Sequence, residues 1–128
     1  MRPSPNQEVV NDTAKLIMHR LIARSLAHDP TLIARAKIAL AAMARNFPNR
    51  TFIRDWDDIL GLPPHQVVAR LTSRDQEMRR LRLSSPFVTA DGVDFTGQDL
   101  RRRIRRAAKR IAARSQGVAR QRHRKTAA

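Results

Sequence analysis

The chain has 128 residues, which is enough for one domain, and 41% of them are apolar although only 4% are aromatic. It has no cysteine, which excludes disulfides and thiolate metal sites and suits a reducing cytoplasm. The formal charge is +15, and residues 100–128 contain 12 of the 26 lysines and arginines but none of the 11 acidic residues. This asymmetry predicts a polyanionic partner, and no stretch approaches the roughly 18 apolar residues of a membrane span.

Two long helices are predicted in the first third of the chain. Residues 1–10 are polar and rich in proline, and we expect them to be disordered and not to form a signal peptide. Asn11 or Asp12 can cap a first helix that ends near residue 27. The dipeptide Asp29-Pro30 starts a second helix, which ends near residue 45. Since the second helix is apolar around much of its circumference, it is either buried on two sides or presents a face to a partner.

Three short helices are predicted next. The first runs from about residue 51 to residue 60, and the second opens at Pro63-Pro64, because proline suits the first helical position. Thr72 or Ser73 can cap the third helix, which ends at the serines and proline of residues 84–86.

A small hairpin and a last helix complete the predicted elements. The segment 87–95 is predicted to form two short strands around Asp91-Gly92, a dipeptide that favours tight turns. The last helix should begin at Thr96 and reach about Ser115, because Gly117 breaks the pattern.

The predicted fold is therefore all-α, a compact bundle of five to six helices with at most one minor β-hairpin and a basic C-terminal helix and tail. The predicted organisation is a disordered N-terminus at 1–10, a single helical domain at 11–115, and a basic disordered tail at 116–128.

The last helix has an apolar face and a basic face. The apolar face is expected to contain Leu100, Ile104, Ala107 and Ile111. Arginine predominates on the other face, and its planar guanidinium suits phosphate oxygens. The alternatives are an ordinary solvated surface, an acidic protein partner or an anionic membrane, of which the membrane is disfavoured because the helix lacks Trp and Phe anchors. The residues predicted to contact nucleic acid phosphates are Arg101, Arg102, Arg105, Arg106, Lys109 and Arg110.

A second nucleic-acid site is predicted from residues 56–71, whose pattern resembles a helix-turn-helix. His65, Gln66 and Arg70 would face a groove of the nucleic acid. Asp57 and Arg70 depart from the usual pattern, because small or apolar residues are expected at their positions. The alternative interpretation is a plain corner between two short helices.

The sequence does not predict an enzyme. Asp55, Asp57 and Asp58 could together hold Mg²⁺, but they also suit the first turns of a helix. The histidines lack zinc-ligand spacing, and His19 is placed off the apolar face of the first helix. No metal and no other cofactor is expected.

Three stretches resemble small helical proteins of proteobacteria, some of which look like antitoxin-side components of toxin–antitoxin loci. These are Trp56-Asp-Asp-Ile-Leu-Gly-Leu-Pro63, followed by Leu71-Thr-Ser73, and Arg80-Leu-Arg-Leu-Ser-Ser-Pro-Phe87. The resemblance covers residues 12 to about 110 and implies binding of a protein partner as well as DNA. The resemblance implies that a partner protein would contact Arg80, Arg82, Ser84, Ser85 and Phe87. The alternative interpretation is that Ser84-Ser85-Pro86 only ends a helix and that Phe87 is a core residue.

The sequence thus predicts a small cytoplasmic protein that binds DNA or RNA through the phosphate backbone and has a regulatory or accessory role. The alternative function is an antitoxin-like module that binds and neutralises a partner protein.

Overall fold

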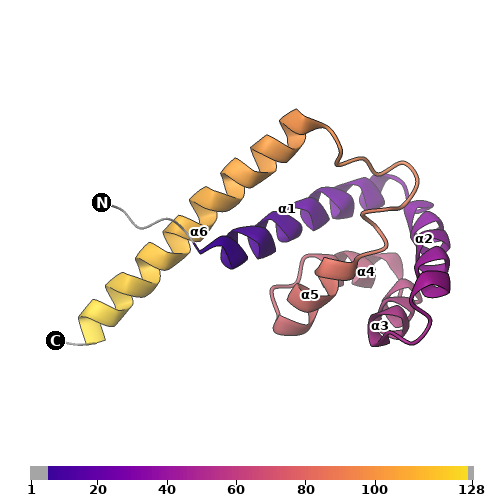
Figure 1. Ribbon diagram of the computed structural model, residues 1–128, viewed down its shortest axis with the longest axis horizontal. Coiled ribbons are helices and arrows are strands. Elements are labelled where there is room, and N and C mark those ends of the chain that lie inside the picture. The colour runs from indigo at the N-terminus through magenta and orange to yellow at the C-terminus, as the bar shows by residue number, and fades with distance from the viewer. Residues whose placement is uncertain (1–5, 127–128) are drawn as a thin grey trace.

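The computed structural model describes residues 6–126, and describes side chains over residues 6–115. It is all-helical, with six α-helices and one short 3-10 helix, η1, as Figure 1 shows. No strand occurs in the described residues, so the all-α prediction is confirmed. The elements are α1 (Gln7–His28), α2 (Leu32–Asn46), α3 (Thr51–Leu60), α4 (Pro64–Leu71), α5 (Gln76–Leu81), η1 (Arg82–Ser84) and α6 (Gln98–Thr126).

The main core lies between α1 and the short helices α2–α5. It is mostly aliphatic, as the low aromatic content predicts, but Trp56 and Phe87 lie at its centre with ring centroids 6.1 Å apart in an edge-to-face arrangement. The indole Nε1–H of Trp56 donates to the Leu81 carbonyl at 3.1 Å. The buried members are Ile22, Leu26, Leu32, Ala36, Leu40, Trp56, Ile59, Leu60, Val67, Leu71, Met78, Leu81, Phe87 and Ala90.

A second, smaller hydrophobic cluster joins α6 to α1. It consists of Val10 from α1 and Ala108 and Ala112 from α6. Figure 1 shows α6 crossing the N-terminal part of α1, while α2–α5 gather around the rest of α1. Ile111, predicted on the docked face of α6, lies at the edge of this contact, where it is 38% exposed and lines a pocket with residues of α1. Small alanine side chains occupy the contact instead and let the two helices approach closely.

Helix α1 begins earlier than predicted. Asn6 caps it, and its side chain accepts a hydrogen bond from the Glu8 amide at 2.9 Å. The prediction of disorder is therefore wrong for residues 7–10, where the buried Val10 fixes the first turns against α6. Residues 1–5 lie outside the described part of the chain.

The cap of α5 also differs from the prediction. Asp75, and not Thr72 or Ser73, accepts from the Met78 amide at 2.7 Å. The Ser73 hydroxyl instead donates to the carboxylate of Asp75 at 2.8 Å. These hydrogen bonds lower the pKa of Asp75 below its ordinary value.

The predicted hairpin at 87–95 is not formed. The Asp91-Gly92 turn is present, with the Val93 amide donating to the Ala90 carbonyl at 3.1 Å and Gly92 at a φ of 84°. No ladder continues from this turn, because Phe87 is buried in the main core and the guanidinium of Arg35 on α2 donates to the Asp91 carbonyl at 2.9 Å. Burial and this anchor hold the segment against the helices, whereas two short strands alone are marginally stable.

Helix α6 is longer than predicted, since its end lies at Thr126 and not near residue 115. A single glycine inside a helix costs only about 1 kcal/mol relative to alanine, so Gly117 need not end it. The predicted disordered tail at 116–128 lies outside the residues whose side chains are described. Among the described helices, none combines the length and the apolarity that crossing a membrane requires.

Candidate nucleic-acid interface

The basic residues of α6 are exposed along its described length. The buried side of the helix carries Ile104, Ala108 and Ala112 at a spacing of four residues. Helical geometry places Arg101 and Arg105 beside this side and the other basic residues away from it. Asp99 in the first turn is the last acidic residue of the chain. The exposed basic residues are Arg101, Arg102, Arg103, Arg105, Arg106, Lys109, Arg110 and Arg114.

These side chains have few partners within the described residues. The guanidinium of Arg105 donates to the Asn11 side chain of α1 at 3.4 Å. None of them takes part in an ion pair over residues 6–115. Like charges three and four residues apart, such as Arg102 with Arg105 and Arg106, repel each other by a few tenths of a kcal/mol per pair. A row of phosphates along this face would relieve the repulsion.

The predicted helix-turn-helix corresponds to α3 and α4, joined by residues 61–63. His65 and Gln66 are exposed in the first turn of α4, and Val67 is buried in the main core. Arg70 is half-buried and turns toward α5, where it lies 4.0 Å from the carboxylate of Glu77. Of the three residues predicted to face a groove of the nucleic acid, only His65 and Gln66 are exposed, since Arg70 faces the carboxylate of Glu77.

The two predicted nucleic-acid sets lie on different helices. Helix α4 contacts α1 and α3, whereas α6 contacts α1. Figure 1 shows α4 on the side of α1 that carries the short helices and α6 across the opposite end of α1. The structure therefore does not bring His65 and Gln66 together with the arginines of α6.

The residues predicted as a partner surface do not form one exposed patch. Arg80 is exposed and pairs with Asp55 at 3.5 Å, and Ser84 is half-buried. Arg82, Ser85 and Phe87 are buried, the last of them against Trp56, so they do not contribute to an exposed protein-binding surface in this conformation. The helix-stop and core interpretation accounts for their positions.

The acidic residues of α3 do not converge. Asp57 and Asp58 are exposed, and Asp55 faces Arg80. In residues 6–115, no three His, Cys, Asp or Glu side chains gather as a metal site would require.

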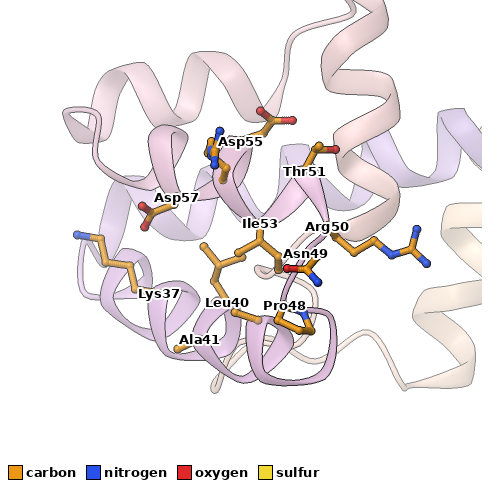
Figure 2. A pocket seen from close by; sticks show the side chains of 12 residues that line it. Lys37, Leu40, Ala41, Pro48, Asn49, Arg50, Thr51, Ile53, Asp55 and Asp57 are labelled. Atoms are coloured by element: carbon orange, nitrogen blue, oxygen red, sulfur yellow. The ribbon is translucent and has the colours of Figure 1, made fainter.

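An open groove of about 750 Å³ is lined by α2, α3 and the segment that joins them. Figure 2 shows Leu40 and Ile53 between the two helices, with Lys37 and Asp57 on one side and Arg50 on the other. The outer side of α2 is partly apolar, as the sequence predicts for a helix with two apolar faces. Ile38 on this side is 69% exposed, and Phe47 at the end of the helix is 50% exposed.

Sequence reasoning misplaced His19, which is fully buried. Its Nδ1–H donates to the Lys15 carbonyl at 2.7 Å, and its Nε2 is buried without a partner. Desolvation lowers the pKa of His19 from 6.5 to about 4, so the ring is neutral near pH 7. The spacing from His19 to Ile22, Ala23 and Leu26 matches one helical face and was the signal for burial.

No family model, curated protein or solved structure matches this chain.

Proposed function

We propose that the chain binds nucleic acid by contacting the phosphate backbone with the basic side chains of α6. The observation that carries the proposal is the continuous exposure of these side chains on a helix with no acidic residue after Asp99. Each phosphate that an arginine neutralises releases condensed counterions, which favours association at moderate salt.

The chemistry of this face favours backbone contact over base reading. Arginine forms bidentate hydrogen bonds to phosphate oxygens. The described part of α6 has no aromatic residue that could stack on a base. Binding should therefore be weakly sequence-specific.

Replacing Arg102, Arg105 and Lys109 together with alanine should make the salt dependence of binding shallower. The log–log slope of affinity against salt should fall by about three units, or one for each lost phosphate contact. Fluorescence anisotropy with labelled duplex DNA and single-stranded RNA, titrated over salt, measures this slope. Alanine favours the helix at least as well as the residues it replaces, so α6 should persist.

A matched control removes the same charge elsewhere. Arg45, Arg50 and Arg54 are exposed on and between α2 and α3, and their triple alanine variant should keep the wild-type slope. Equal losses in the two triple variants would show that only the net charge matters. An unchanged slope in the α6 variant would refute the assignment.

A second candidate function is antitoxin-like binding of a partner protein. The exposure of Ile38 on α2 and of Phe47 just after it supports this function, because exposed apolar side chains are common at protein interfaces. Tagged wild-type chain purified from its native host should then retain a stoichiometric protein partner, and Ile38→Glu should lose it. Gln66→Glu, an exposed change on α4, is the control. Equal recovery with Ile38→Glu, or no stoichiometric partner at all, would contradict this function.

A further inference from the structure

A separate pocket of about 460 Å³ lies along one side of α1, where it is bounded by α5, η1 and α6. Its volume is in the range of sites that hold one small molecule. No residue of the predicted nucleic-acid or helix-turn-helix sets lines it. The lining residues are Val9, Asp12, Thr13, Leu16, Arg20, Arg74, Arg79, Arg82, Ile111 and Ser115.

The charge of the pocket is strongly unbalanced. Arg20, Arg74, Arg79 and Arg82 line it, whereas Asp12 is its single acidic lining residue. None of the four arginines takes part in an ion pair over the described side chains. The chain has no Asp or Glu in residues 100–128 that could supply one from the rest of α6. Arginines that line one pocket without ion-pair partners attract an anion, although Asp12 and Asp75 partly offset the positive charge at Arg82.

Arg82 is held in place by hydrogen bonds but lacks an ion-pair partner within the described side chains. The side chain is 2% exposed, and its Nη1 donates to the carbonyls of Leu71 at 3.2 Å and Ser73 at 2.5 Å. These bonds hold the guanidinium in place. Its Nε–H is buried and has no acceptor. A buried donor without a partner is unfavourable, so an oxyanion that reached it would remove a penalty as well as add an ion pair.

The rest of the pocket is not cationic. Val9, Leu16 and Ile111 give it apolar walls, and Thr13 and Ser115 add hydroxyls. Val9 and Arg20 lie eleven positions apart on α1, about three helical turns, so the apolar side chain is far from the arginine along the helix. A ligand that fills the pocket therefore needs an anionic head and an apolar body.

We infer that the pocket binds a small organic phosphate monoester, with the phosphoryl group among the arginines and the organic part against Leu16. A carboxylate is satisfied by one guanidinium, whereas a dianionic phosphoryl group offers three terminal oxygens to several guanidinium groups at once. The inference does not depend on the nucleic-acid proposal, because the two use different arginines.

Isothermal titration calorimetry of the full chain with phenyl phosphate tests the inference. We expect saturable binding at a single site. Inorganic phosphate, which lacks the apolar body, and benzoate, whose single-charged carboxylate replaces the phosphoryl group, should each bind at least about tenfold more weakly. Arg20→Gln and Arg79→Gln should each weaken phenyl phosphate binding by about tenfold, the loss of one charge-assisted hydrogen bond. Arg24→Gln, an exposed change on the same helix outside the pocket, should leave it unchanged.

Several outcomes would overturn the inference. One is the absence of saturable phenyl phosphate binding. Another is a loss of binding in Arg24→Gln as large as in Arg20→Gln or Arg79→Gln. A third is an affinity for inorganic phosphate equal to that for phenyl phosphate. The variant with alanine at Arg102, Arg105 and Lys109 separates the two proposals, because it should keep phenyl phosphate binding while its DNA binding becomes less salt-dependent. Loss of phenyl phosphate binding in that variant would place the anion site on α6 and refute the pocket.

Discussion

Replacing Trp56 with alanine should lower the free energy of unfolding by about 3–5 kcal/mol, which is a large part of the stability of a domain this size. The side chain is fully buried, packs edge-to-face on Phe87, and donates to the Leu81 carbonyl. Its removal would leave a cavity between α3 and the segment that follows α5. It would also leave the Leu81 carbonyl without that donor.

Urea denaturation followed by far-UV circular dichroism measures this effect, because Trp56 is the only tryptophan and its fluorescence is lost in the variant. Trp56→Phe should cost less, since it keeps most of the ring and loses mainly the hydrogen bond. Phe47→Ala, at a half-exposed aromatic, is the surface control and should cost little. A loss below about 1 kcal/mol for Trp56→Ala would mean that the main core is not packed as described.

Acidification from pH 6.5 to pH 4 should destabilise the protein through His19. Its pKa is about 4 in the folded chain and 6.5 ordinarily, so the unfolded chain binds the extra proton in this interval and the folded chain does not. The contribution of His19 therefore makes stability fall as the pH falls from 6.5 to 4, and this contribution levels off below pH 4. The full difference corresponds to about 3 kcal/mol, an upper limit that partial hydration of the ring would reduce.

Urea midpoints measured across this pH range test the expectation. His19→Leu should be less dependent on pH between 6.5 and 4, whereas the exposed His65→Gln should retain the wild-type dependence. The hydrogen-bonded carboxylates of Asp29, Asp75 and Asp94 have pKa values below 3.8, so their contribution is lost at lower pH than that of His19. An unchanged dependence in His19→Leu would contradict the role given to the buried ring.

Local signals were sufficient to predict α2, α3 and α4 from the sequence. Asp29 accepts from the Thr31 amide at 3.1 Å ahead of α2, and Pro64 opens α4 as proline at a first helical position should. The Gly61 amide donates to the Asp57 carbonyl at 3.1 Å at the C-terminal end of α3. Each of these features depends on residues that are neighbours in the chain, so their effect is visible without the rest of the fold.

Features that depend on distant residues were missed. Val10 orders the start of α1 only because Ala108 and Ala112 cover it. The predicted hairpin does not form, because Phe87 packs against Trp56 in the main core and does not join a strand. The exposed arginines of α6 could be inferred from helical periodicity, whereas the arginine pocket combines side chains from α1, α5, η1, α6 and the loop before α5.

The division of the interior into two unequal clusters has a consequence for the order in which the molecule opens. Helix α6 is held by Val10, Ala108 and Ala112, with Ala14 and Ile17 beside them, whereas the main core unites α1–α5. Helix α6 should thus undock in a local opening of low free energy that leaves the larger unit closed. Hydrogen exchange should then be faster at the amides of α6 than in the second half of α1, and a bound polyanion should slow it in α6 first. The helix that carries most of the net positive charge would act as a separate cooperative unit, and its docking on α1 and its binding of a polyanion would stabilise each other.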